Sequence, residues 1–179
     1  MRRGEIIGLK WNDIDFERMT FEIKRAATPV KGEGTVTDKT KNVKSMRKLE
    51  LPEVMKPILL SLRAKQSESK LRLDEKWIDE NWIFTQWNGA LMSIHTPDIW
   101  WSKMKREHDK IPDKTLHTLR HTFATYLINN NVPLSAVSGA LGHAQQSTTL
   151  NIYSHVLEDS KKAAMQAHEA HIMGLKKQV

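Results

Sequence analysis

Apolar and polar residues alternate along two short stretches in the first third of the chain. The first runs over 19–23 and the second over 47–51, with the apolar side chains at every second position. This period is typical of β-strands with one buried face. The segment 28–37 lies between them and contains a proline and two glycines, which predict a loop. We therefore predict a small antiparallel sheet near the N-terminus.

Around this sheet the pattern predicts one short helix, one long helix and a possible further strand. Residues Glu5 to Leu9 have the pattern of the end of a short helix. The apolar run Trp82-Ile83-Phe84 is short and bounded by Asn81 and Gly89, so it predicts a possible third strand. After Pro52 the spacing becomes helical. The apolar stripe of that helix is expected to contain Val54, Ile58, Leu59 and Leu62.

The second half of the chain has the period of helices. Thr96 followed by Pro97 predicts an N-cap and a first helical turn. A helix is predicted over 117–128, and Gly142 is expected to end another that begins at Pro133. From 148 onward the chain is expected to be mostly helical, with a break near Gly174. The predicted fold class is α+β, a mainly α-helical domain with a small antiparallel β-sheet near the N-terminus.

The composition fits a globular domain in a reducing compartment. The chain has 179 residues, of which 39% are hydrophobic, and no cysteine, so disulfides and thiolate metal sites are excluded. No apolar run approaches the roughly 20 residues of a membrane span. We expect no signal peptide at the first residues, because no hydrophobic segment follows the positive charges.

Positive charge is concentrated in one part of the sequence. The formal net charge is +7, and nine basic residues against three acidic residues lie between Arg18 and Lys48. Clustered cations are typical of proteins that bind a polyanion, because each neutralised phosphate releases counterions. The alternative is a basic surface that faces only solvent.

The residues with the strongest chemical pattern lie in the last third of the chain. They are the run His117-Thr118-Leu119-Arg120-His121, then Leu141-Gly142-His143, then Asn151-Ile152-Tyr153-Ser154-His155. On a helix His117 and Arg120 project from one face, while Leu119, Phe123 and Leu127 can anchor the opposite side. Tyr126 lies within an apolar helix. Tyr153 has the polar residues Asn151 and Ser154 on its two sides, as an accessible nucleophile would, so we expect it to be the exposed tyrosine.

Taken one by one, most of these residues have a structural explanation. An isolated arginine, tyrosine or tryptophan is usually a surface or packing residue. His117 and His121 are four apart and resemble a metal pair, but Thr118 stands where a zinc protease needs glutamate, so no metal is expected. We expect His155, His168 and His171 to be surface or packing residues, and the tryptophans to be core residues.

Together, these segments resemble the tyrosine recombinase family of phage and conjugative-element integrases. The resemblance covers the opening Met1-Arg2-Arg3-Gly4-Glu5 and Trp11-Asn12-Asp13-Ile14-Asp15, then the three segments above in the same order. It extends from Met1 to about Val156. A type IB topoisomerase shares the chemistry, but the Leu-Gly-His and Ile-Tyr-Ser-His segments favour an integrase.

The resemblance implies a catalytic set and a mechanism. The six implied residues are Arg2, Lys41, His117, Arg120, His143 and Tyr153. Lys39 remains an alternative to Lys41, because the register of the basic hairpin is uncertain. Tyr153 would form a 3′-phosphotyrosyl bond, the arginines would bind the phosphate, and His117 would help to accept the phenolic proton. No ATP, metal or other cofactor is implied.

The resemblance also implies partners and a domain arrangement. Residues 1–179 would be the catalytic domain, without the N-terminal core-binding and arm-binding domains, and 158–179 would be a C-terminal helical tail. The expected partners are double-stranded DNA and further copies of the chain in a tetrameric synapse, with no membrane. A cytoplasmic location, bacterial or phage-encoded and near the nucleoid, is expected. The alternative function is a DNA-binding fragment that keeps the fold but does not cleave.

Overall fold

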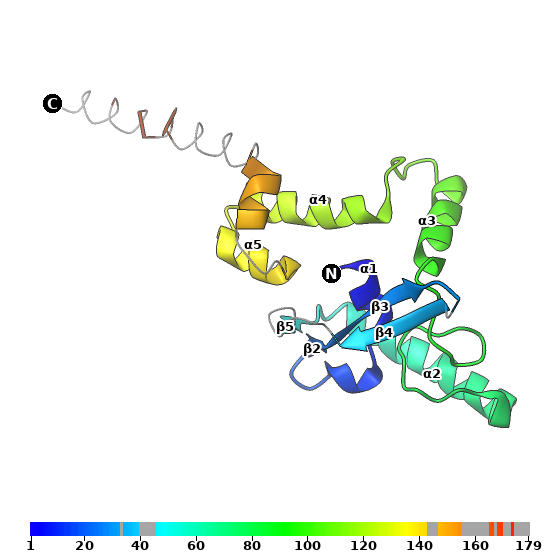
Figure 1. The fold of residues 1–179 in the computed structure, drawn as a ribbon. Coiled ribbons are helices and arrows are strands. Elements are labelled where there is room, and N and C mark those ends of the chain that lie inside the picture. Colours follow the sequence, from blue (N-terminus) through cyan, green and yellow to red (C-terminus); the bar gives the residue numbers. More distant parts are fainter. Residues whose placement is uncertain are drawn as a thin grey trace. The chain divides into compact units, whose positions relative to one another are not determined.

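The computed structural model describes most of the chain as two compact units. The described residues are 1–32, 34–39, 46–142, 147–154, 165–166, 168–169 and 173. The first unit is Met1–Thr118 and the second is Leu119–Val179. Within the described ranges, all strands belong to the first unit, and the second unit consists of helices (Figure 1). We describe each unit by itself.

A three-stranded antiparallel sheet holds the predicted strands together. Its order is β1 (Ile14–Asp15), β2 (Thr20–Ile23) and β5 (Arg47–Glu50). In the centre of the β2–β5 pair Phe21 is opposite Leu49, so the apolar residues of both strands share a face. Both strand predictions are confirmed, because alternation with one buried face fixes the register.

The segment expected to be a loop forms a hairpin instead. Strands β3 (Arg25–Val30) and β4 (Gly34–Lys39) pair antiparallel, with Pro29 opposite Thr35. The loop prediction is therefore wrong outside the turn. Proline is tolerated because each strand of a two-stranded sheet has one unpaired edge, where a missing N–H breaks no ladder bond. Gly34 has φ +82°, a conformation that glycine adopts without strain at the turn.

The N-terminal residues form two short helical segments, and one isolated bridge joins them to the segment 82–91. Helix α1 (Arg3–Ile7) and the 3₁₀ turn η1 (Trp11–Asp13) confirm the short helix at this place. Trp82 makes only an isolated antiparallel bridge with Lys10, and a second bridge joins Thr85 to Leu91. The possible third strand is therefore wrong, because each pairing is a single bridge and the segment does not join either named sheet.

The long helix α2 (Met55–Leu73) covers the apolar face of the three-stranded sheet. Leu59 is buried there and Leu62 is half-buried. Val54 and Ile58 are exposed, so half of the predicted stripe is wrong. Val54 precedes the first helical turn, and Ile58 lies about 100° around the helix from Leu59. The core cluster consists of Leu9, Trp11, Phe21, Ile23, Leu51, Leu59 and Ile83.

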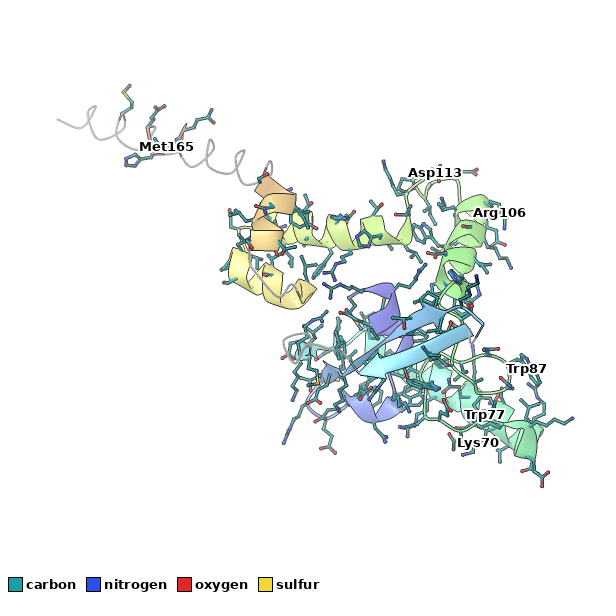
Figure 2. All side chains as sticks on the ribbon, in the orientation of Figure 1. Lys70, Trp77, Trp87, Arg106, Asp113 and Met165 are labelled. Atoms are coloured by element: carbon teal, nitrogen blue, oxygen red, sulfur yellow. The ribbon has the colours of Figure 1, made fainter. Side chains whose placement is uncertain are left out.

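After the 3₁₀ turn η3 (Asp74–Lys76), the first unit continues to helix α3 (Thr96–Glu107). This helix begins at the predicted place, but its N-cap is His95 and Thr96 is the first helical residue. The prediction that the tryptophans are core residues is only partly right. Trp11 and Trp82 are buried, whereas Trp87 and Trp100 are exposed; Figure 2 labels Trp87 at the surface.

The second unit is a small helical cluster. Helix α4 (Leu116–Asn129) spans the unit boundary, α5 (Leu134–Leu141) follows, and residues 147–154 are helical. Gly142 ends α5 in the left-handed conformation, with φ 67°, as the sequence predicts. The core contains Ala124, Ile128, Val137, Leu141 and Tyr153.

The buried face of α4 differs from the predicted one. Leu119 and Phe123 are exposed, while Ala124 and Ile128 are buried. The buried positions lie on the same side as Arg120 because they follow it at steps of four. In the described residues no helix is both long and apolar enough to cross a bilayer. Helices with small antiparallel sheets near the N-terminus confirm the α+β class.

Candidate active site

Arg2 lies directly before helix α1 and is fixed by the first turn of that helix. Its backbone N–H donates to Oε2 of Glu5 at 2.7 Å, and its Nη1 donates to Oε1 of the same carboxylate at 3.0 Å. The Glu5 side chain is buried, but half of the Arg2 side chain remains exposed. The exposed part of the guanidinium can therefore contact a ligand while Nη1 stays bonded to Glu5.

A second arginine contacts the same carboxylate from strand β5. Arg47 donates from Nη1 to Oε1 of Glu5 at 3.1 Å and from Nη2 to Oε2 at 2.9 Å, in a two-pronged pair. Burial raises the pKa of Glu5, but the bonds from Arg47 and Arg2 outweigh it and hold the pKa below its usual value. Glu5 was missed as a site residue, although its spacing of three from Arg2 is the signal for this contact.

Arg120 is fixed by the end of another helix. Its Nη2 donates to the backbone carbonyl of Leu141 at 2.6 Å. Leu141 is the last residue of α5, where carbonyl oxygens have no partner within the helix and carry the negative end of the helix dipole. The turn at Gly142 thus gives Arg120 a fixed orientation, which the sequence motif alone does not predict.

Tyr153 is buried rather than accessible. Only 3% of its surface is exposed, and it packs in the second core cluster. Its hydroxyl lies 2.9 Å from Nδ1 of His121, and the two ring centroids are 5.9 Å apart. Burial raises the pKa of Tyr153, while the nearby Arg120 guanidinium acts in the opposite direction. The expectation of an accessible Tyr153 is wrong for this conformation.

The other tyrosine has the opposite environment. Tyr126 is 63% exposed on α4, although the sequence suggests an apolar helix around it. Tyr126 is two positions after Ala124, so it lies on the far side of α4 from the buried residues. Tyr153 follows Thr149 by four positions, and both are buried, which places them on the inner face of the helical segment 147–154.

The predicted site residues lie in the first unit, in the second unit or outside the described residues. Arg2 and His117 belong to the first unit, whereas Arg120 and Tyr153 belong to the second. His117 is exposed in the first turn of α4, three positions before Arg120. Lys41 and His143 lie outside the described residues. The alternative Lys39 is the last residue of β4. His121, which the sequence suggests only as half of a metal pair, is the residue that contacts Tyr153.

No group of three or more potential metal ligands occurs among the residues that the structure describes. His117 and His121 have one turn of α4 between them, and His121 is engaged with the Tyr153 hydroxyl. A two-histidine pair is also short of the three or four protein ligands that zinc sites require.

Much of the basic stretch between Arg18 and Lys48 is used inside the first unit. Four of its basic residues make ion pairs with carboxylates, namely Arg18 with Asp15, Lys24 with Glu22, Arg25 with Asp13, and Arg47 with Glu5. Three of these acids precede Arg18, so a count confined to the stretch overstates its free charge. Lys31 and Lys48 are exposed.

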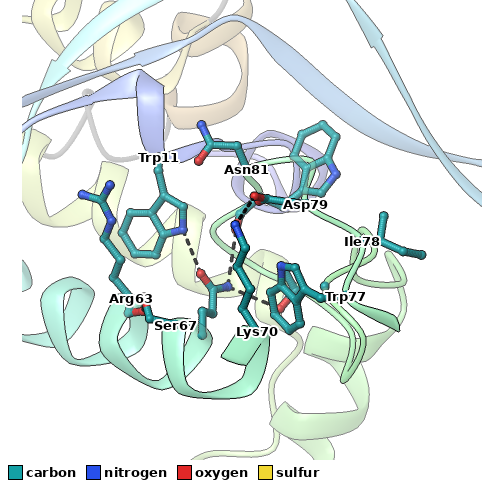
Figure 3. Close-up of a pocket in the computed structure, with 12 residues that line it drawn as sticks. Trp11, Arg63, Ser67, Lys70, Trp77, Ile78, Asp79 and Asn81 are labelled. Atoms are coloured by element: carbon teal, nitrogen blue, oxygen red, sulfur yellow. Dashed lines mark hydrogen bonds and ion pairs between the residues drawn. The ribbon is translucent and has the colours of Figure 1, made fainter. Parts of the chain in front are cut away.

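A separate pocket lies between α2 and the segment 77–89 (Figure 3). Its volume is about 190 Å³, and the rings of Trp11, Trp77 and Trp82 contribute to its walls. Gln66 accepts from Nε1 of Trp11 at 2.8 Å and donates to the carbonyl of Ile83 at 2.9 Å. These bonds hold α2 against the rest of the first unit, so the polar residues of the pocket have a structural role.

Comparison with known proteins gives a match along nearly the whole chain. Residues 1–160 match the model of the phage integrase family. The tyrosine recombinase XerC-like protein of Caldanaerobacter subterraneus subsp. tengcongensis is 32% identical over 93% of this chain and 45% of its own length. The integrase of Staphylococcus phage L54a is 30% identical over 88% of this chain and 45% of its own. The chain thus spans about half the length of these relatives.

Solved structures show the same fold. The Tn1549 transposon integrase in complex with circular intermediate DNA superposes with a TM-score of 0.73 at 24% identity, over 93% of this chain and 55% of that one. The XerA recombinase superposes with a TM-score of 0.62 at 23% identity, over 91% of this chain and 53% of that one.

Proposed function

We propose, because this chain belongs to the phage integrase family, that it cuts and rejoins DNA as the catalytic part of a tyrosine recombinase. The observation that carries the proposal is the family match over residues 1–160, which includes Arg2, Arg120 and Tyr153. Residues 1–179 would then be the catalytic domain of the enzyme, with 158–179 as its C-terminal tail.

In the proposed reaction the phenolic oxygen of Tyr153 attacks the phosphorus of a DNA phosphodiester. The bond between phosphorus and tyrosine forms, the bond to the 5′-oxygen breaks, and the 5′-oxygen takes up a proton. The phenolic proton passes to a nearby base. Because the energy of the broken bond is kept in the phosphotyrosine, the reverse attack by a 5′-hydroxyl can reseal the strand without ATP.

The proposed roles of the other residues follow from the charge of the reaction. The transition state spreads negative charge over the non-bridging phosphate oxygens, which guanidinium groups match in shape and charge. Arg2 and Arg120 are each oriented by a buried or helical acceptor, and this supports their assignment to the phosphate. We assign proton transfer to His117, His143 and Lys41, with Lys39 as the alternative lysine.

The proposed partner is double-stranded DNA, bound by several copies of the chain. Support comes from the relatives: the Tn1549 integrase was solved in complex with circular intermediate DNA, and the XerH recombinase was solved bound to a palindromic substrate in a post-cleavage complex. The burial of Tyr153 favours a second candidate, a DNA-binding protein of the same fold that does not cleave.

Covalent capture distinguishes the two candidates. The protein is incubated with a randomised pool of nicked duplexes, on which a cleaved strand loses a short fragment and cannot be resealed. After denaturation, protein-linked DNA is recovered and sequenced, and the linked peptide is mapped. We expect an adduct at Tyr153 that forms in EDTA, because no metal takes part in the proposed step.

The two tyrosines provide a matched control. Tyr153→Phe removes the attacking oxygen but keeps the ring, so it should abolish the adduct and leave DNA binding nearly unchanged. Tyr126→Phe should leave adduct formation at the native level. An adduct that maps to Tyr126 would refute the assignment of the nucleophile. DNA binding without any adduct would establish the non-catalytic candidate instead.

A further inference from the structure

The hydroxyl of Tyr153 is held inside the second unit by one specific contact. Its oxygen is 2.9 Å from Nδ1 of His121, on the side of α4 that faces the core. The two rings are tilted by 55° rather than stacked, so the contact is a hydrogen bond and not an aromatic sandwich. Ala124, one turn after His121, is fully buried and packs in the same cluster as the Tyr153 ring.

This contact gives the buried Tyr153 hydroxyl a hydrogen-bond partner. A hydroxyl taken out of water without a partner costs free energy, so a buried tyrosine usually has a hydrogen bond. In the imidazole tautomer protonated at Nε2, the lone pair at Nδ1 accepts a hydrogen bond from the phenolic O–H. The phenol remains neutral, since burial raises the pKa of Tyr153 and the adjacent Arg120 only partly offsets this.

The same contact is incompatible with attack on DNA. A nucleophilic oxygen must come within about 3.5 Å of the reacting atom. With only 3% of the residue exposed and its hydroxyl bonded to His121, Tyr153 presents almost no surface to a phosphodiester in this conformation. Cleavage therefore requires the Tyr153 side chain, or the helical segment 147–154 that carries it, to leave this position.

We propose that His121 is a positioning residue that latches Tyr153 in a buried resting position, and that DNA cleavage begins with the release of this hydrogen bond. The inference rests on the proposed role of Tyr153 as the nucleophile. The latch keeps the phenol away from solvent and from adventitious phosphates until DNA binding shifts the second unit to an open state.

The latch is tested without DNA in a protein that carries Tyr126→Phe, so that Tyr153 is the single tyrosine. Incorporated 3-fluorotyrosine gives one fluorine resonance, and its shift between H₂O and D₂O reports the exposure of the ring. We expect a small solvent shift in the latched protein. His121→Leu removes the acceptor and should enlarge the shift toward that of free fluorotyrosine.

A conservative variant separates the hydrogen bond from general packing. In His121→Asn the side-chain oxygen stands near the position of Nδ1 and can still accept from the phenol. The solvent shift of His121→Asn should therefore stay close to that of the parent protein. An unchanged shift in His121→Leu would mean that apolar packing alone buries Tyr153, and the latch would be rejected.

Cleavage gives the second readout. Loss of one net hydrogen bond should raise the open fraction, and with it the rate of adduct formation on nicked duplexes, by about two- to tenfold. A more exposed Tyr153 with slower cleavage would show that His121 assists attack instead, and would overturn the latch. If no variant forms an adduct, the proposed function fails, while the fluorine measurement still decides whether the contact holds Tyr153.

Discussion

At the scale of single residues, one buried carboxylate organises two arginines. Glu5 accepts two bonds from Arg2 and two from Arg47, and its own side chain is almost completely removed from water. A buried charge of this kind is tolerated only while it is paired. The orientation of Arg2 therefore depends on a residue that makes no contact with DNA in the proposed reaction.

The first prediction concerns this carboxylate. Glu5→Gln should lower the free energy of unfolding of the first unit by about 3 kcal/mol, because it leaves the buried Arg47 without its charge partner. Urea unfolding followed by tryptophan fluorescence reports this unit, since all six tryptophans precede residue 118. The control is Glu50→Gln at an exposed glutamate of β5, the strand that carries Arg47, and it should change the value by less than about 0.5 kcal/mol.

The effect should also depend on pH in a defined direction. The pKa of Glu5 is held below its usual value of 4.5, so its stabilising contribution is complete above that pH and disappears as the pH falls through the lower folded value. The parent protein should therefore lose stability on acidification below about pH 4.5 more steeply than Glu5→Gln. Parallel curves for the two proteins would contradict the pairing.

The residue scale also shows how far sequence reasoning reaches. The sequence motifs single out Arg2, His117, Arg120 and Tyr153, because the order and spacing of a family's residues can be read directly from the sequence. The exposure of the two tyrosines was assigned the wrong way round, because it depends on which face of each helix meets the core. The contact between Glu5 and Arg47 joins residues 42 positions apart, and no local pattern encodes it.

At the scale of elements, α1 and β3 approach each other more closely than a side chain permits. A Cβ added to Gly4 would lie 2.3 Å from the carbonyl oxygen of Ala27. Glycine at this position lets the helix lie against the hairpin, and the helix in turn fixes Glu5. The close approach is thus part of what positions Arg2.

The second prediction follows from this approach. Gly4→Ala must push α1 away from β3, which should destabilise the first unit by roughly 1–3 kcal/mol and reduce adduct formation through the displaced Arg2. The control is Gly139→Ala on α5, where an added Cβ meets nothing within 4 Å. There alanine should be neutral or should stabilise the helix by up to about 1 kcal/mol. Equal stability losses in both variants would contradict the steric argument.

Elements with a clear hydrophobic period were predictable from the sequence. The two-stranded hairpin and the buried face of α4 were not. The alternation of β2 and β5 and the glycine stop of α5 were read correctly from the sequence. The β3–β4 hairpin was missed because its proline and glycines are also typical of loops. The inner face of α4 was misassigned because Ala124 carries little apolar weight, while the larger Leu119 and Phe123 are exposed.

At the scale of the whole molecule, the positive charge available to the proposed DNA partner is smaller than the sequence suggests. Arg25, for example, donates to the carbonyl of Gly8 at 3.1 Å and to the carboxylate of Asp13, so it ties the hairpin to the N-terminal residues. Burial raises the pKa of Asp13, but the hydrogen bonds and charges around the carboxylate, first among them the bond from Arg25, outweigh burial. The pKa of Asp13 is therefore below its usual value. Such cations stabilise the fold and are engaged before any phosphate arrives.

The third prediction separates structural cations from DNA-binding ones. Anisotropy of a labelled duplex, measured over a range of salt concentrations, gives the slope of log affinity against log salt. Lys48→Gln should reduce the magnitude of this slope by about 0.9, the value for one lost phosphate contact. Arg25→Gln should leave the slope nearly unchanged and lower the unfolding free energy instead. A reversed pattern, with Arg25 controlling the slope, would show that the ion pair opens on DNA.

The pairing of β2 with β5 also sets an order of assembly during synthesis. Thr20 is opposite Glu50 and Ile23 is opposite Arg47, so the sheet closes a long loop, whereas the helices of the second unit form from neighbouring residues. Non-local pairing of this kind slows folding. On the ribosome, Glu5 can pair only with Arg2 until Arg47 has left the exit tunnel. Arg2 precedes Arg47 in the chain, but the carboxylate that orients Arg2 is completely paired only after β5 has been translated.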